Sequence, residues 1–152
     1  MNILVDENIP QAQTCFSTLG SVRLMPGRQI TSSDLENTDV LIVRSVTPVT
    51  EALLKASPVR FVGTATIGVD HIDQDFLATR DIAFASAPGC NARSVAEYVI
   101  AGLLELEAAR DFKLEEKTLG IIGAGNVGRC LQELAQRLGM TVRACDPPLA
   151  AQ

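Results

Sequence analysis

The residues most able to do chemistry form a glycine-rich motif, GIIGAGNVGRC, late in the chain. An apolar stretch before it predicts a strand, and NVGRCLQELAQRLG after it predicts a helix. Gly123 permits a tight turn, Gly125 lets a diphosphate approach the backbone, and Gly128 lets helix and strand pack closely. The N–H groups of Asn126 and Val127, at the helix N-terminus, favour an anion. The motif therefore predicts a binding site for the pyrophosphate of a dinucleotide.

A second predicted strand, TVRACD, ends in Asp146, roughly 20 residues beyond the last glycine of the motif. A carboxylate at this distance binds the ribose hydroxyls of the adenosine and repels a 2′-phosphate, so the sequence favours NAD over NADP. The alternative is a glycine turn in another α/β fold, with Asp146 as a solvated strand end. The order strand, turn, helix, strand and acid favours the dinucleotide site.

Polar and small residues follow three other predicted strands, at Arg44 and Ser45, at 64–68 and at 87–90. The hydroxyls of Ser45 and Thr66, with backbone amides of the 64–68 loop, could bind a carboxylate or phosphate. Alternatively, Ser45 caps a turn and Thr66 satisfies local backbone groups. Arg44 could add charge to anion binding, but a structural ion pair is equally expected.

Short apolar strands alternate with helical stretches through the first 90 residues. Strands are predicted at 2–7, 21–26, 39–45, 59–65 and 82–88, and helices at 10–20, 51–57 and 72–80, with a helical turn near 32–37. Pro10 suits the first turn of the first helix, and Thr50 suits a cap of the second. This alternation predicts right-handed βαβ crossovers and a parallel sheet, with the ligand crevice outside the carboxyl ends of the strands.

A long predicted helix, about 93–110, separates these strands from the glycine motif. Asn91 or Ser94 suits its N-cap, and apolar residues cover most of its circumference, which is typical of a helix enclosed by another domain or subunit. The sequence thus predicts a first domain at 1–92, a connecting and pairing helix at 93–116, and a second domain that begins at 117 and continues to 152.

Composition narrows the class of protein. The chain has 152 residues, 47% of them hydrophobic and 20% charged, which are values of globular proteins. A formal net charge of −5 argues against nucleic-acid binding. No run is apolar enough for a membrane span, and the acidic start at Asp6 and Glu7 does not resemble a signal peptide, so we expect a cytoplasmic protein. The cysteines show no metal-ligand spacing and are expected to be reduced and mostly buried thiols: Cys15, Cys90, Cys130 and Cys145.

Six stretches of the chain resemble the D-2-hydroxyacid dehydrogenases. They are ILVDENIP, VRSVTPV, FVGTATIGVDHID, APGCNARSVAEYV, GIIGAGNVGR and CDPP. The resemblance implies a flavodoxin-like substrate domain, followed by the first βαβ unit of a Rossmann NAD-binding domain, with substrate in the cleft between the two domains. It also implies a homodimer and a small anionic substrate, a phosphorylated 2-hydroxy acid. By the same resemblance Ser45 and Thr66 contact the substrate, and Asn126, Val127 and Asp146 contact NAD.

The catalytic residues of such an enzyme have no match in this chain. Oxidation of a hydroxyl needs a base, usually histidine, and an arginine that holds the substrate carboxylate. The family supplies an Arg, a Glu and a His from later segments. The single histidine, His71, matches a position that opens a helix, so we expect it to be structural. The chain is therefore expected to be the front portion of a dehydrogenase, inactive alone. The alternatives are a non-catalytic NAD-binding or dimerisation module, or a partly folded remnant.

Overall fold

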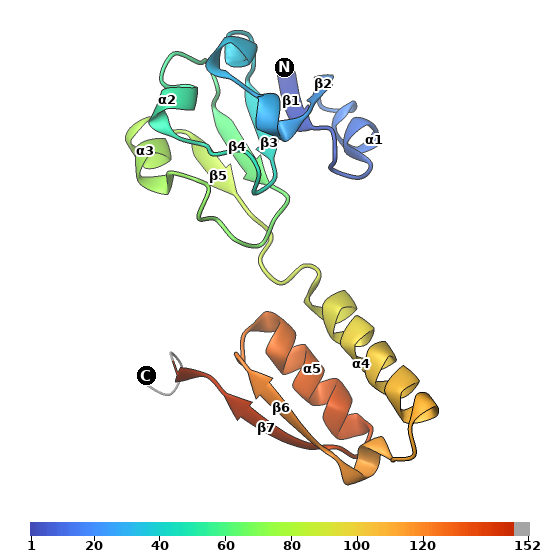
Figure 1. Ribbon diagram of the computed structural model, residues 1–152. Coiled ribbons are helices and arrows are strands. Elements are labelled where there is room, and N and C mark those ends of the chain that lie inside the picture. Colours follow the sequence, from blue (N-terminus) through green and yellow to red (C-terminus); the bar gives the residue numbers. More distant parts are fainter. Residues whose placement is uncertain (148–152) are drawn as a thin grey trace. The chain divides into compact units, whose positions relative to one another are not determined.

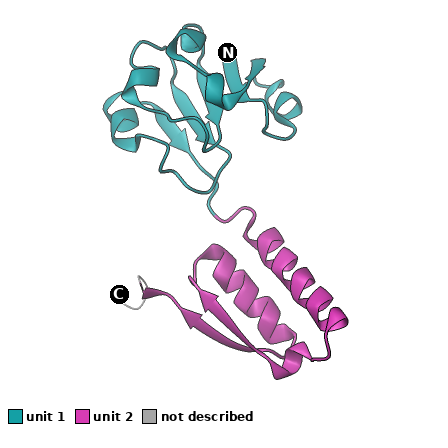
Figure 2. Ribbon diagram, viewed as in Figure 1, with its two compact units in different colours: residues 1–88 teal, residues 89–152 magenta. Residues whose placement is uncertain are grey.

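The computed structural model describes residues 1–147, so the last proline of the CDPP stretch lies outside the described residues. The chain divides into two compact units, residues 1–88 and residues 89–152 (Figure 2). No helix within the described residues is both long enough and apolar enough to cross a bilayer.

The first unit is a five-stranded parallel sheet (Figure 1). Its strands are β1 (Asn2–Asp6), β2 (Ser21–Met25), β3 (Val40–Val43), β4 (Phe61–Thr64) and β5 (Ala83–Ala85). The order β2-β1-β3-β4-β5 is that of a flavodoxin-like sheet, which confirms the predicted architecture. Strand order reverses between β1 and β3, where such sheets bind their ligands, at the carboxyl ends of the strands.

Short helices connect these strands: α1 (Ala12–Phe16), α2 (Glu51–Leu54) and α3 (Gln74–Thr79), with 3₁₀ turns at Gly27–Gln29 and Ser32–Leu35. Two details of the predicted helices were wrong. Gln11 adopts a left-handed conformation (φ 60°), so Pro10 lies before α1 rather than in its first turn. Thr50 occupies the N-cap of α2 but its side chain makes no capping hydrogen bond. By contrast, the Asp73 carboxylate caps α3 by accepting a hydrogen bond from Phe76 N–H.

Both faces of this sheet are apolar, as expected for a parallel sheet. The larger core cluster contains Leu4, Leu41, Val43 and Val62, together with residues of α2 and α3 that include Leu54 and Leu77. The smaller cluster is formed by side chains on the other face of the same strands. It contains Ile3, Val5, Ala12 and Ile42. The buried strands hold the loops after their carboxyl ends in fixed positions.

The second unit is one βαβ unit preceded by a long helix. Helix α4 (Ala92–Ala109) leads through a 3₁₀ turn (Leu114–Glu116) to β6 (Thr118–Ile122), α5 (Asn126–Arg137) and β7 (Thr141–Cys145). Strands β6 and β7 are parallel neighbours, as the crossover through α5 requires. Helix α4 packs against α5, and Leu114, Ala135 and Met140 form the small core.

Helix α4 leaves several of its apolar side chains exposed within this chain. Within the described residues only Ala92 and Ala96 of this helix are fully buried. Tyr98 is 81% exposed, and Val95, Leu104 and Leu106 are also exposed. At the end of β6, Ile122 is 92% exposed. Because α4 packs against α5, it belongs to the second compact unit, whereas the sequence placed it in a separate connecting segment.

Candidate functional site

The glycine turn between β6 and α5 has three glycines in three different environments. Gly123 adopts φ +94°, in the left-handed region that side chains rarely occupy. A Cβ on Gly128 would overlap the carbonyl oxygen of Gly123, so helix and strand approach here as closely as the sequence predicts. A Cβ on Gly125 would meet nothing within 4 Å. The space over Gly125 is therefore open, at the residue that caps the N-terminus of α5.

Asp146 lies at the turn although it is 22 residues from Ala124 in the chain. Its carboxylate accepts a hydrogen bond from Ala124 N–H at 2.6 Å, and Gly123 N–H donates to the carbonyl of Cys145 at 2.8 Å. On the other side of the loop, Arg129 Nε donates to the carbonyl of Ala124 at 2.9 Å. The predicted acid and the predicted turn are thus brought together.

This arrangement suits a dinucleotide. The amides at the start of α5, at Asn126 and Val127, point along the helix axis toward the turn, where the helix dipole favours a diphosphate. The open space over Gly125 leaves room for the phosphates, and Asp146 stands at the end of the neighbouring strand, where a ribose would lie. The side chain of Asn126 packs close to Gly89, since a Cβ there would come within 2.9 Å of it.

A second candidate site lies at the carboxyl ends of β3 and β4 in the first unit. The register pairs Val43 with Thr64, so Ser45 and Thr66 each follow the paired ends by two residues. Ser45 is exposed, and Thr66 is half-buried in the loop after β4. The two hydroxyls predicted to bind an anion thus follow adjacent strands on one edge of the sheet.

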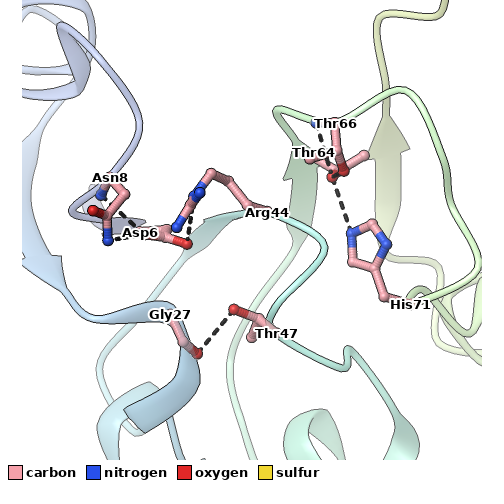
Figure 3. A network of polar contacts seen from close by, with 8 residues as sticks. All are labelled: Asp6, Asn8, Gly27, Arg44, Thr47, Thr64, Thr66 and His71. Atoms are coloured by element: carbon pink, nitrogen blue, oxygen red, sulfur yellow. Dashed lines mark hydrogen bonds and ion pairs between the residues drawn. The ribbon is translucent and has the colours of Figure 1, made fainter.

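Beside them Arg44 forms the structural ion pair that the sequence offered as the alternative to anion binding, with a partner that the sequence did not identify (Figure 3). Arg44 Nε donates to Asp6 Oδ2 at 3.0 Å, and Asn8 N–H donates to Asp6 Oδ1 at 2.9 Å. Asp6 is 0% exposed, whereas one third of the Arg44 side chain reaches solvent. Burial by itself raises the pKa of Asp6, but the hydrogen bonds from Asn8 and Arg44 outweigh it and hold the pKa below its usual value.

The backbone of Gly27 packs closely against the Asp6 side of the ion pair. Gly27 lies so near that a Cβ would overlap the Asp6 carboxylate and come within 2.8 Å of the Thr47 hydroxyl. Thr47, also buried, donates a hydrogen bond to the Gly27 carbonyl at 2.9 Å. An acid at the end of β1, where the strand order reverses, was the available sequence signal. It was read only as evidence against a signal peptide.

His71 does not open a helix, because α3 begins at Gln74. Its ring instead contacts the loop after β4 (Figure 3): Nε2 lies 3.0 Å from Thr64 Oγ1, which lies 2.9 Å from Thr66 Oγ1. Burial lowers the pKa of His71, and the nearby Asp70 carboxylate opposes this only in part. The imidazole is therefore neutral at pH 7.

Side chains able to ligate a metal ion do not gather in the described part of the chain. Residues 1–147 contain no group of three or more His, Cys, Asp or Glu side chains that could hold a metal ion. The four cysteines are free thiols, three of them exposed: Cys15, Cys90 and Cys145. Exposure of these thiols differs from the predicted burial of most cysteines.

Comparison with known proteins extends over almost the whole chain. Residues 3–146 match the family described as D-isomer specific 2-hydroxyacid dehydrogenase, catalytic domain. The chain is 54% identical over 150 residues to an erythronate-4-phosphate dehydrogenase from Salinibacter ruber, and 53% identical over 150 residues to one from Escherichia coli. These matches cover 99% of the chain but only 38% and 40% of the relatives.

Solved structures show the same fold. An NAD⁺-bound 3-phosphoglycerate dehydrogenase from Entamoeba histolytica aligns with a TM-score of 0.73 at 27% identity, covering 97% of this chain and 54% of that one. A D-lactate dehydrogenase from Aquifex aeolicus, in complex with NAD and lactic acid, aligns with a TM-score of 0.72 at 23% identity, covering 95% of this chain and 50% of that one. The structural neighbours therefore include dehydrogenases bound to nicotinamide cofactors.

Proposed function

Because the chain belongs to the D-isomer specific 2-hydroxyacid dehydrogenase family, we propose that it provides the substrate-binding unit and the start of the NAD-binding unit of an erythronate-4-phosphate dehydrogenase. The reaction is the oxidation of 4-phospho-D-erythronate at C2 to 2-oxo-3-hydroxy-4-phosphobutanoate, a step toward pyridoxine 5′-phosphate. The activity is suggested by the names of relatives that are 51–54% identical. The chain spans about two fifths of their length.

The observation that carries the cofactor assignment is the open backbone over Gly125 beside Asp146. NAD⁺ held at this turn would supply the hydride acceptor for oxidation at C2 of the substrate. In this chain, Gly123, Gly125 and Gly128 shape the turn, and the amides of Asn126 and Val127 bind the pyrophosphate. The Asp146 carboxylate accepts hydrogen bonds from the adenosine ribose and excludes a 2′-phosphate by charge repulsion.

The substrate assignment places an anion at the ends of β3 and β4. Ser45 and Thr66 offer hydroxyl donors, and backbone amides of the loop after Thr64 add further donors. No base is proposed within the described residues, because the Arg, Glu and His that the resemblance implies have no match in this chain. We therefore expect no turnover from the 152-residue chain alone.

Calorimetric titration with NAD and with NADP tests the cofactor site. We expect NAD to bind at least tenfold more tightly than NADP, since a like-charge contact between Asp146 and a 2′-phosphate costs about 1.4 kcal/mol or more. Asp146→Asn keeps an oxygen that can accept from Ala124 N–H but removes the charge, so it should reduce this preference. Equal affinity for the two cofactors in the unaltered chain would contradict the proposed role of Asp146.

A spectrophotometric assay with 4-phospho-D-erythronate and NAD tests the absence of turnover. Formation of NADH by the isolated chain would show that this chain contains the residues needed for the reaction. Adding NAD and substrate separately, with binding measured for each, distinguishes a chain that binds without turnover from one that binds neither.

The exposed apolar residues of α4 favour a second candidate, a non-catalytic module that binds NAD and pairs with a second copy. Val95, Tyr98 and Leu106 are exposed, and their helical spacing puts them on one face of α4. An exposed apolar face of this kind is typical of an interface. Light scattering should report a homodimer, and Tyr98→Ser should weaken it. A monomer at all concentrations would remove this candidate.

A further inference from the structure

Three polar groups behind the predicted anion site lie within hydrogen-bonding reach of one another (Figure 3). His71 Nε2 is 3.0 Å from Thr64 Oγ1, and Thr64 Oγ1 is 2.9 Å from Thr66 Oγ1. Thr66 N–H also donates to Thr64 Oγ1, at 3.4 Å. Thr64 is 6% exposed, so its contacts are almost wholly with protein. The directions of these bonds decide where the Thr66 hydroxyl hydrogen points.

A count of donors and acceptors leaves only two arrangements. A threonine hydroxyl has one hydrogen and two lone pairs, and Thr66 N–H already takes one lone pair of Thr64. Thr64 must therefore donate to one of its two remaining neighbours and accept from the other. Either His71 Nε2–H donates to Thr64, which donates to Thr66, or Thr66 donates to Thr64, which donates to an unprotonated Nε2.

The position of Thr66 selects the first arrangement. Its hydroxyl also lies 3.4 Å from the carbonyl oxygen of Gly68, in donor geometry. A carbonyl oxygen can only accept, so when Thr66 donates its single hydrogen there, its oxygen accepts from Thr64. At 3.4 Å this bond is long and weak, and the hydrogen can turn to a ligand at little cost.

We propose that His71 is a positioning residue: through its Nε2–H and the hydroxyl of Thr64, it keeps the hydroxyl hydrogen of Thr66 directed outward, ready to donate to an anionic group of the substrate. The inference rests on the proposed function, which supplies the anionic ligand of Thr66. It gives the single histidine a role in substrate binding without proton transfer. The opposite tautomer would turn the Thr66 hydrogen inward and present an oxygen lone pair to the anion.

The tautomer can be observed directly, because His71 is the only histidine in the chain. A two-dimensional ¹H–¹⁵N spectrum that correlates ring carbon-bound protons with both ring nitrogens gives one set of signals, without an assignment problem. At pH 7, where burial keeps the ring neutral and the Asp70 carboxylate opposes this only in part, we expect the proton on Nε2. A proton on Nδ1 would overturn the inference.

Binding of 4-phospho-D-erythronate to the 152-residue chain, measured by calorimetry, tests the consequence. Thr66→Val should weaken binding about tenfold or more, as expected for a lost hydrogen bond to an anion. His71→Leu should weaken it about three- to tenfold. His71→Gln, whose amide can donate from nearly the same position, should recover most of the loss. If the ring only filled space, the amide of His71→Gln would not restore the affinity.

A double-mutant comparison tests whether His71 acts on Thr66 through the Thr64 hydroxyl. In a Thr64→Val background the hydroxyl that joins the two residues is gone, so His71→Leu should produce no further loss of affinity. Additive losses would overturn the inference. If Thr66→Val weakens binding and His71→Leu does not, the inference is wrong and the proposed substrate site stands. If the unaltered chain does not bind the ligand, the proposed function is wrong for this chain, and the tautomer alone decides the direction of the hydrogen bonds.

Discussion

The two units of the chain present their candidate sites in opposite ways. In the first unit the site consists of side chains: hydroxyls at 45, 64 and 66, the ring of His71, and a carboxylate and a guanidinium held by buried strands. In the second unit it consists mainly of backbone, exposed where glycine removes the side chain. The first kind of site is lost when a functional group is removed, and the second when a methyl group is added.

The supporting structure differs as well. The first unit has five paired strands and two apolar clusters. The second has two strands and one small cluster within its described residues, and it exposes Ile122 and Tyr98. Because buried apolar area is the main source of stability, we expect the first unit to unfold at higher denaturant concentration. Each substitution below should act on one unit and spare the other.

The largest effect is expected from Gly128→Ala. The new methyl group would overlap the carbonyl oxygen of Gly123, which is backbone and cannot turn aside. Overpacking of this kind should destabilise the second unit by about 3 kcal/mol. Hydrogen–deuterium exchange followed by mass spectrometry, which resolves the two units, should show faster exchange in 118–145 and unchanged exchange in 1–88.

Gly125→Ala is the matched control for that substitution. Its methyl group meets nothing within 4 Å and its φ is −72°, so stability should change by less than about 0.5 kcal/mol. The same methyl group would occupy the space left for the phosphates, and NAD affinity should fall at least about tenfold. If Gly125→Ala instead binds NAD normally, the open space over the turn is not the pyrophosphate site.

The next largest effect is expected from Asp6→Ala, which removes the acceptor of Arg44 and Asn8 in the first unit. This change leaves Arg44, which is two thirds buried, without its partner. It should lower the free energy of unfolding by about 2 kcal/mol. Glu97→Gln is the control, because the Arg93–Glu97 pair is exposed on α4 and its loss should cost less than about 0.5 kcal/mol. Similar losses for both variants, measured by urea unfolding, would show that burial adds nothing to the Asp6 pair.

Sequence reasoning succeeded best where the local pattern alone determines the structure. The glycine spacing at 123–128 gave the turn, and the acid at 146 lies against it as expected. The parallel sheet followed from alternating apolar strands and helices. Contacts that join distant segments were missed, since nothing near Asp6 in the sequence indicates Arg44, which is 38 residues away. The contact of His71 with Thr64 was also missed, because it depends on how the loop after β4 folds back.

A smaller effect is expected at the helix N-termini of the first unit. Asp73 caps α3 through a hydrogen bond from Phe76 N–H at 3.0 Å, whereas Thr50 makes no such bond at α2. Asp73→Ala should therefore destabilise the first unit by about 1 kcal/mol, and Thr50→Ala by only a few tenths. Both are measured by urea unfolding of the first unit. Equal losses would mean that the Asp73 carboxylate stabilises α3 by something other than its capping bond.

The smallest effect is the response of the two units to mild acid. Burial lowers the pKa of His71 in the folded chain, so between its folded pKa and its unfolded value of about 6.5 the unfolded chain binds the extra proton. The stability that His71 contributes is therefore present above pH 6.5 and is lost as the pH falls through this window. Urea unfolding of the first unit at several pH values should show the loss, and His71→Gln should remove it.

The glycine turn offers the contrast. Backbone amides do not titrate, so NAD affinity should stay nearly constant over the same pH window. The stability contributed by Asp6 changes only at lower pH. Because the pKa of Asp6 is depressed in the folded chain, this contribution is complete above the unfolded pKa of about 3.9. A first unit whose stability is unchanged from pH 7.5 to 5.5, or changes equally in His71→Gln, would show that the ring is not held in a buried, neutral state beside Thr64. The difference between a site made of titrating side chains and one made of backbone would then disappear in this pH range.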